Sequence, residues 1–269
     1  MSLVITYRDA GRYYGISGVY SPTGNYSDTT SDMSVQTVMG DISLSRTYNS
    51  LQSDADSIVG NGFTFNYAMK VISKTNNVIV IMPSSAQWQF KKNGADYLAV
   101  DNSGVLAFEN DKYKLTTIDM TEYGFNTNGF LEYVKDSEGN QLNITTDSSG
   151  KILLITDKNG TNINFVYSGG LLTKIEEMKD ETVIETVEYT YSDNKLMKVK
   201  YPGGLEKHYE YIDGRLTKVT DSGAENTSPL TSTEITYYTT GKYEGMVNSL
   251  TDSIGVKSTY TYDFAGHST

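Results

Sequence analysis

The side chains that most often carry out chemistry in proteins are few and scattered in this sequence. His208 and His267 are its only histidines, and the chain contains no cysteine. A zinc site or a histidine-based acid–base site needs several such groups close together. The sequence therefore predicts neither, and His208, beside Tyr209, is best interpreted as an outward-facing residue of a sheet. Phosphate-binding and nucleophile-elbow motifs are also missing, because Gly60-Asn-Gly62 lacks the third glycine of a dinucleotide fingerprint.

Carboxylates are abundant, but their spacing favours turns over a metal site. Asp157-Lys-Asn-Gly160 resembles the opening of a calcium loop, yet Ser168 stands where the last ligand, a glutamate, is required. Asp54 and Asp56 are close together without a further acidic partner, and no two carboxylates stand out as a glycosidase pair. Aspartate readily accepts hydrogen bonds from turn N–H groups, and it recurs in register at Asp136, Asp157, Asp221 and Asp252. We predict turn structure at these positions, with no metal and no cofactor.

Trp88, the single tryptophan, admits two interpretations. An exposed indole ring could serve as a platform for a ligand such as a sugar. Trp88 lies, however, in the alternating run 86–90, which is typical of a strand, and a lone tryptophan in such a run usually belongs to the core. We expect a core residue and keep the ligand platform as the alternative.

Composition limits the class of protein and its partners. The 22 tyrosines and 24 glycines, with only 4 prolines, favour strands joined by tight turns. A net charge of −11 argues against binding to nucleic acid or to an anionic membrane surface, since both require clustered Lys and Arg. No apolar run approaches the length of a membrane-spanning helix, and Met1-Ser2-Leu3 does not begin a signal peptide. We expect the chain to be an excised internal piece of a longer protein, with any export signal upstream of it.

An internal repeat of about 20 to 30 residues occupies the second half of the chain. Each copy begins with Gly or Asn and continues with an apolar strand, and the six copies lie at 129–136, 150–157, 170–175, 194–199, 214–221 and 245–252. A turn signal follows most copies, then a second strand with aromatic residues two positions apart. Each unit is therefore predicted to be a β-hairpin. Repeats of this length change the expected fold from a compact core to an array of stacked units.

The aromatic pairs are the expected structural core of the array. Residues i and i+2 of a strand face the same side, so we predict that the rings of successive units stack as a ladder, made by Tyr167, Tyr189, Tyr191, Tyr209, Tyr211, Tyr237, Tyr260 and Tyr262. One feature leaves two alternatives open. Leu216 and Val219 are three residues apart and would face opposite sides of a flat strand, so either a bulge separates them or both faces are covered.

The chain divides into three predicted parts. Residues 1–40 are rich in Ser, Thr, Gly and Tyr and are expected to form a loosely ordered N-terminal arm. Residues 41–128 are strand-rich without a regular repeat, and residues 129–269 hold about six hairpins. The predicted fold class is all-β: an extended, curved antiparallel sheet of consecutive β-hairpins.

The repeat resembles the YD repeat of RHS proteins, a family of wall-associated proteins and polymorphic toxins. Gly214-Arg-Leu-Thr-Lys-Val-Thr-Asp221 and Thr259-Tyr-Thr-Tyr-Asp263 carry the resemblance best, and Gly40-Asp-Ile-Ser-Leu-Ser-Arg-Thr-Tyr-Asn-Ser50 is similar to the segment that precedes the repeats. The resemblance spans roughly residues 38 to 266. Phe63 departs from the usual tryptophan, and the Asp-Pro signature of the self-cleaving core does not occur.

The resemblance implies a ribbon of strands that coils into a hollow shell around a C-terminal payload, often a toxin. We accordingly expect a non-catalytic structural segment that is extracellular or on the bacterial cell surface, with the rest of the shell and its payload as partners. Open strand edges suggest edge-to-edge dimers. The alternatives are a module that binds carbohydrate or another cell-surface partner, and a hydrolase that a single Asp or Glu substitution would inactivate.

Overall fold

The computed structural model describes residues 18–20, 22–75, 77–82, 86–93, 96–99, 104–223 and 229–262. Within these ranges the regular structure is strand, apart from three short 3-10 turns at η1 (Ser50–Gln52), η2 (Pro202–Gly204) and η3 (Gly241–Tyr243). No helical segment of the described residues has the length and apolar character needed to cross a bilayer. The predicted all-β fold, with consecutive antiparallel hairpins, is confirmed.

A small inner sheet is formed by the N-terminal part of the chain. Its antiparallel order follows the sequence: β1 (Val19–Tyr20), β2 (Asn25–Thr37), β3 (Gly40–Asn49) and β4 (Phe63–Phe65). Residues 25–37, which lie inside the expected N-terminal arm, form its longest strand, and residues 1–17 of that arm lie outside the described residues. The long β2–β3 hairpin is stable because small hydroxyl side chains pair across it, as Thr29 and Thr47 do at 2.9 Å.

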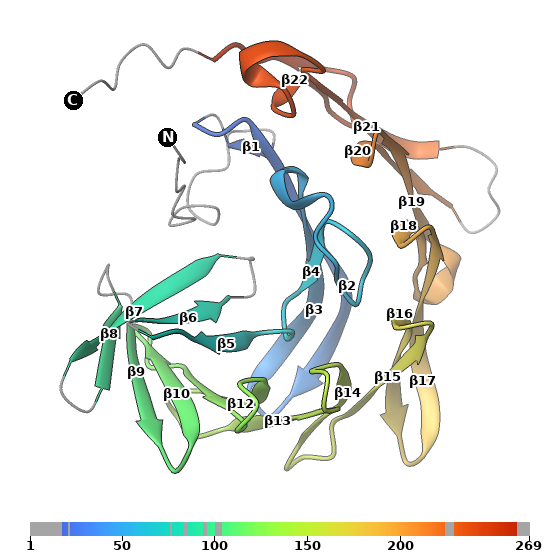
Figure 1. Cartoon of the computed structure of the whole chain (residues 1–269). Coiled ribbons are helices and arrows are strands. Elements are labelled where there is room, and N and C mark those ends of the chain that lie inside the picture. Colours follow the sequence, from blue (N-terminus) through green and yellow to red (C-terminus); the bar gives the residue numbers. More distant parts are fainter. Residues whose placement is uncertain are drawn as a thin grey trace.

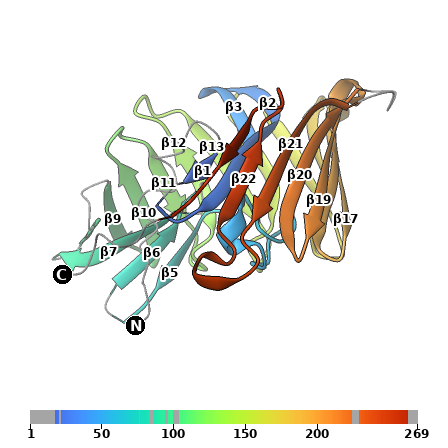
Figure 2. The same ribbon diagram turned by 90° about the horizontal axis from the view of Figure 1, so that it is seen from above.

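The remainder of the chain is one ribbon of antiparallel strands, each paired with the next in sequence. Its strands are β5 (Lys70–Ser73), β6 (Asn77–Ile81), β7 (Gln87–Asn93), β8 (Asp96–Ala99), β9 (Gly104–Glu109), β10 (Lys112–Thr117), β11 (Glu122–Phe125), β12 (Leu131–Lys135), β13 (Gln141–Thr146), β14 (Ile152–Asp157), β15 (Asn162–Ser168), β16 (Leu171–Lys179), β17 (Thr182–Ser192), β18 (Lys195–Lys200), β19 (Glu206–Ile212), β20 (Arg215–Ser222), β21 (Pro229–Tyr237), β22 (Val247–Thr251) and β23 (Lys257–Thr259). Figure 1 shows the ribbon curving around the inner sheet, and Figure 2 shows the same wrapping from above.

The ribbon curls on itself at its beginning and stays open further along. A β-bridge between Lys70 and Phe130 brings β5 back against the start of β12. From β13 onward each strand pairs only with its sequence neighbours, and no register joins β23 to β5 among the described strands. The division between the two sheets falls between Phe65 and Lys70.

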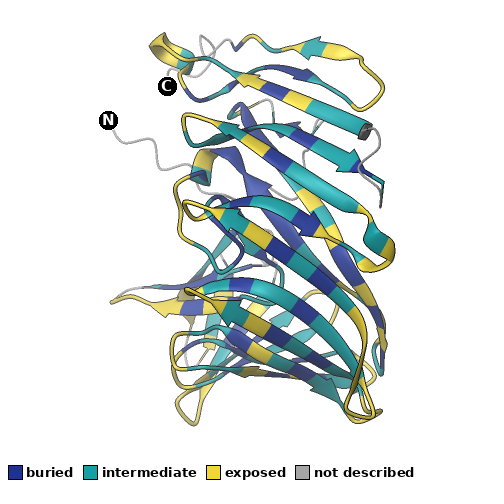
Figure 3. Cartoon of the chain, turned by 90° about the vertical axis from the view of Figure 1, so that its right-hand side faces the viewer, coloured by how far each residue is buried: buried dark blue, intermediate teal, exposed yellow. Residues whose placement is uncertain are grey.

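Buried residues recur at intervals along the strands of the ribbon (Figure 3). Leu216 and Val219 are both buried, as are Leu196 and Val199. The pairing of β19 with β20 shifts by one residue between Glu210 and Tyr211, so one residue of β20 is extra. A β-bulge is therefore the correct alternative for these positions, and the same shift recurs in β13–β14, β15–β16, β17–β18 and β21–β22.

Many hairpin turns share one construction, in which a Gly with positive φ follows an Asp by three residues. Gly139 and Gly150 have φ of 84° and 88°. A Cβ at Gly139 would meet no atom within 4 Å, whereas one at Gly150 would lie 2.3 Å from the Phe130 ring. We expect Gly139→Ala to cost about 1–2 kcal/mol of unfolding free energy, from backbone strain alone.

We expect Gly150→Ala to cost more, about 2–3 kcal/mol, because the Phe130 ring has to move as well. Urea unfolding of the two variants side by side measures the difference. Equal losses for both variants would contradict the role of the Phe130 contact.

Candidate functional site

The contact between the N-terminal segment, with its inner sheet, and the ribbon holds an extensive set of polar interactions, and we call this contact the seam. One hydrogen bond recurs along the seam. Its donor is the backbone N–H of the residue two positions after the Gly that opens a unit. A bulge releases the N–H of that residue from the strand ladder, and the N-terminal segment accepts the hydrogen bond instead. The four bonds are Leu131 N to Met69 O (3.2 Å), Leu172 N to Ile58 O (2.7 Å), Leu216 N to Tyr48 Oη (3.0 Å) and Val247 N to Gly24 O (2.9 Å).

The carbonyl of the same position is bound by a tyrosine of its own unit. The first and second strands of a unit pair only near their turn and separate toward the other end. In β20–β21, for example, the pairing ends at Lys218 and Glu234. The second tyrosine of each aromatic pair fills this gap and donates its hydroxyl to the first strand: Tyr167 to Ile152 O (2.8 Å), Tyr191 to Leu172 O (2.7 Å), Tyr211 to Leu196 O (2.8 Å), Tyr237 to Leu216 O (2.9 Å) and Tyr262 to Val247 O (2.7 Å).

The predicted stacking of rings from unit to unit is wrong. None of the eight predicted tyrosines makes a ring contact with another of them among the described residues; instead Tyr209 meets Phe63 of the inner sheet at 5.6 Å between centroids. The reason is geometric, because equivalent strands of successive units are separated by an intervening strand, a spacing of about 9–10 Å. Tyr189 and Tyr209 are buried against the inner sheet, and Tyr260 is half-buried against the core.

A buried ion pair lies at the centre of the seam. Asp32 of β2 and Arg46 of β3 are fully covered and meet through Arg46 Nε and Asp32 Oδ2 at 2.8 Å. The ribbon supplies further partners: Tyr189 Oη donates to Asp32 Oδ2 at 2.8 Å, and Arg46 Nη2 donates to Tyr201 Oη at 3.1 Å. The Arg46 guanidinium carbon also lies 5.0 Å from the centre of the Tyr209 ring. Inner sheet and ribbon thus share one charged cluster.

The electrostatics of this cluster favour a fixed structural role. Burial opposes the charge of Arg46, but Asp32 and the surrounding tyrosine oxygens hold its pKa above the ordinary value, so the guanidinium stays cationic. Burial likewise raises the pKa of Tyr189 and of Tyr209 well above the ordinary phenol value. Because the charges neutralise one another within a covered site, the cluster holds two sheets together and presents no group to a substrate.

Sequence reasoning missed this cluster. Arg46 belongs to the run 40–50, which carries part of the family resemblance. That resemblance was the one sequence signal that could have pointed to Arg46. Asp32 sits in a polar stretch without any distinguishing pattern. Tyr189 and Tyr201 lie more than 150 residues beyond Asp32, at sequence separations of 157 and 169. No local periodicity reports a contact of that range.

A group resembling a hydrolase triad surrounds His208. Ser222 Oγ lies 3.2 Å and Glu206 Oε2 lies 3.1 Å from His208, but both contacts are to the same nitrogen, Nε2. A catalytic triad needs the serine and the carboxylate on opposite ring nitrogens, so that one orients the ring while the other transfers the proton. This arrangement therefore does not assemble a nucleophile. Lys198 lies 3.0 Å from Glu206 Oε1 and makes the group part of an outer ion-pair cluster.

The predicted turn aspartates behave as expected at three of four positions. Asp136, Asp157 and Asp252 each accept backbone N–H groups two and four residues ahead. Asp157 Oδ2 also accepts from Val38 N at 2.6 Å, which ties the β2–β3 turn to the ribbon. Asp221 is the exception, because the hairpin here is longer and Asp221 lies inside β20, paired with Lys207 at 2.5 Å.

The other candidate residues are spread over the structure. Asp54 and Asp56 are exposed, and no group of three or more His, Asp or Glu side chains in the described part of the chain is placed to hold a metal ion. Trp88 lies in β7 opposite Val80 and is half-buried against the core. His267 lies outside the described residues.

The Tyr209 ring provides a test of the seam. We expect Tyr209→Ala to lower the unfolding free energy by roughly 2–4 kcal/mol, because a ring with 2% exposure leaves a cavity beside Phe63 and Arg46. Denaturant unfolding followed by circular dichroism measures it. Tyr209→Phe is the control: Tyr209 Oη makes no well-formed hydrogen bond among the described residues, so its removal should change little. A loss below about 0.5 kcal/mol for the alanine variant would place the ring outside the core.

One family model and several solved structures are similar to parts of this chain. Residues 18–90 match the model of a family described as a domain of unknown function, DUF6531, and these residues hold the inner sheet and the first strands of the ribbon. No curated protein matches. The crystal structure of TcdB2-TccC3-TEV aligns over 87% of this chain and 12% of its own, with 14% identity and a TM-score of 0.39.

Two further solved structures align at similar or lower levels. The Photorhabdus luminescens Tc holotoxin pore aligns over 79% of this chain and 12% of its own, with 12% identity and a TM-score of 0.39. A porin-like protein from Bacteroides uniformis aligns over 87% of this chain and 90% of its own, with 10% identity and a TM-score of 0.30. The chain thus spans about an eighth of the Tc chains it matches.

Proposed function

We propose that this chain is a non-catalytic wall segment of a larger YD-repeat protein that is secreted or displayed on a cell surface. In this role the ribbon forms part of a β-sheet shell that encloses or presents a C-terminal payload. The proposal rests on the sequence resemblance and on one structural observation, the seam. A wall has to keep a defined curvature, and the seam attaches four of the six units, at equivalent positions, to the N-terminal segment that contains the inner sheet.

The chemistry of the repeat supports the same role. In four units, the N–H that a bulge releases donates to the N-terminal segment, and tyrosine hydroxyls donate to carbonyls of the ribbon. The buried charges of Asp32 and Arg46 are used in the same way. Polar groups that bond within the molecule suit a support that must resist deformation. A deformation that removes the partner of a buried polar group raises the free energy of the folded state.

Protease protection of the parent chain tests the shell role. A longer chain that carries this sequence and its natural C-terminal continuation should keep that continuation resistant to trypsin under native conditions. Seam variants such as Arg46→Ala should expose the continuation at protease concentrations that leave the unaltered chain intact. Equal digestion of the continuation in both proteins would contradict enclosure by this wall.

A hydrolase screen tests the non-catalytic part of the proposal separately. The purified chain should show no turnover on a panel of polysaccharides and ester substrates. Turnover that disappears with Glu206→Gln or with another single Asp or Glu substitution would identify an enzyme and overturn this part.

A further inference from the structure

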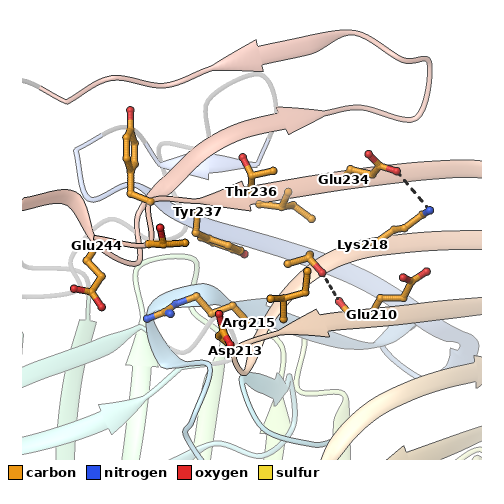
Figure 4. A pocket seen from close by; sticks show the side chains of 13 residues that line it. Glu210, Asp213, Arg215, Lys218, Glu234, Thr236, Tyr237 and Glu244 are labelled. Atoms are coloured by element: carbon orange, nitrogen blue, oxygen red, sulfur yellow. Dashed lines mark hydrogen bonds and ion pairs between the residues drawn. The ribbon is translucent and has the colours of Figure 1, made fainter. Parts of the chain in front are cut away.

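A slot opens in the ribbon between β20 and β21 (Figure 4). Pairing of these two strands ends at Lys218 and Glu234, and beyond this point the strands separate. The same separation occurs in other units, but here the link to the next strand is an insertion, residues 238–246 with η3, that extends one side. The resulting cavity has a volume of about 620 Å³, which is within the usual range of sites for small ligands.

The slot has an apolar floor and faces away from the inner sheet. Glu210 and Thr236 are exposed and alternate with the buried Tyr209 and Ile235, so they point to the opposite face of the ribbon. Ile235 and the ring of Tyr237 form the floor, and Tyr237 is fixed by its hydrogen bond to Leu216 O. Ile212, with 65% exposure, adds an apolar rim.

Arg215 is the unusual residue of this slot. It is half-buried, and its Nε is covered by protein without a hydrogen-bond partner among the described residues. No carboxylate of the described chain lies within ion-pair distance of it, whereas the half-buried Lys207 is paired with Asp221 at 2.5 Å. An unpaired, partly desolvated guanidinium facing a cavity is suited to a ligand carboxylate.

The slot also carries negative charge at other positions. Glu210, Asp213 and Glu244 line it and make no ion pair within the described part of the chain, while Glu234 is already paired with Lys218 at 3.5 Å. A purely anionic ligand would be repelled by these three carboxylates. A purely cationic ligand would leave Arg215 unpaired. Favourable complementarity to both sets requires a ligand that itself carries both signs.

We propose that this slot binds a short peptide with free termini and apolar side chains. The ligand carboxylate would lie against Arg215, the ammonium group would lie toward Glu244, and an apolar side chain would cover Ile235 and Tyr237. This inference does not depend on the wall role. The slot is formed by the insertion at residues 238–246 and by the separation of β20 from β21, and neither feature is needed for a wall.

Isothermal titration with the dipeptide Leu-Leu and three analogues tests the proposal. Leu-Leu-amide lacks the carboxylate, N-acetyl-Leu-Leu lacks the ammonium group, and maltose is a neutral ligand of similar size. We expect Leu-Leu to bind with a Kd of about 1 mM or below, and each analogue to bind at least about tenfold more weakly.

Matched variants assign the two charges to their residues. Arg215→Met should weaken Leu-Leu about tenfold and leave Leu-Leu-amide unchanged, while Glu244→Gln should weaken Leu-Leu and leave N-acetyl-Leu-Leu unchanged. Lys151→Met is the control, because Lys151 follows Gly150 as Arg215 follows Gly214 but belongs to a unit without an insertion. Thermal unfolding checks that each variant is folded.

Four results would overturn the proposal. These are no binding of Leu-Leu up to about 10 mM, equal affinity for a capped analogue, tighter binding of maltose, and unchanged affinity in both Arg215→Met and Glu244→Gln. Glu244 is exposed and Arg215 is half-buried, so at least one of the two variants is expected to keep the native fold.

Discussion

Arg46→Ala is expected to lower the free energy of unfolding by about 3–5 kcal/mol, because it leaves the covered carboxylate of Asp32 without its counter-charge. The variant also removes the donor to Tyr201 and the cation that lies over the Tyr209 ring. Chemical denaturation followed by far-UV circular dichroism measures the loss. The unfolding midpoint should fall with little change in slope, since the same surface is exposed on unfolding.

A double variant separates the ion pair from simple packing. Asp32→Asn combined with Arg46→Met removes both charges and keeps an acceptor for the hydroxyls of Tyr189 and Tyr201. We expect this pair to be more stable than Arg46→Ala alone by at least about 1–2 kcal/mol. Lys112→Met is the surface control: its pair with Glu132 is about half exposed, so its loss should stay below about 1 kcal/mol. If Arg46→Ala lowers the unfolding free energy no more than Lys112→Met does, the buried cluster does not stabilise the fold.

Alkaline pH is expected to unfold the protein steeply, because so many phenols are held neutral by burial. Burial raises the pKa of Tyr48, Tyr67 and Tyr262 to about 12 from an ordinary value of 10.0. The unfolded chain loses these protons first, so the stability contributed by each group is complete below pH 10 and is lost as the pH rises from 10 toward 12. Each such shift corresponds to at most about 3 kcal/mol.

Parallel titrations by circular dichroism and tyrosinate absorbance measure this effect. Ionisation of the buried phenols should coincide with loss of the β-sheet signal, with a free tyrosine derivative as the reference. Tyr48→Phe should flatten the dependence of stability on pH in this window by about one proton. Ionisation of all 22 tyrosines along the ordinary phenol curve, with the fold intact, would contradict the prediction.

The sequence alone contained most of the repeat geometry. Glycine at the start of a unit, Asp and Gly three residues apart in the turns, and aromatic residues two positions apart predicted hairpins that the structure contains. These features are local, since a turn residue responds to backbone angles within a few positions. The turn at Asp221 was mispredicted because the insertion after it lengthens the hairpin, and strand length is set by the partner strand.

The bulge between Leu216 and Val219 marks the limit of local reasoning. The spacing of the two residues was visible, but only burial of both on the same side shows which alternative holds. The stacked ladder failed for a related reason. Each tyrosine satisfies its hydroxyl within its own unit, and its ring is covered by an inner sheet whose position no repeat pattern encodes.

The sequence by itself determined an all-β chain, its repeat length and most of its turns. The tertiary structure decided how the ribbon is held: the first strands fold inside it, Asp32 and Arg46 are buried together, and tyrosines from distant units form hydrogen bonds with both. Turns follow from short-range backbone preferences, which a sequence displays directly. The pairing of buried polar groups more than a hundred residues apart depends on which surfaces exclude water together, and that is settled when the two sheets pack.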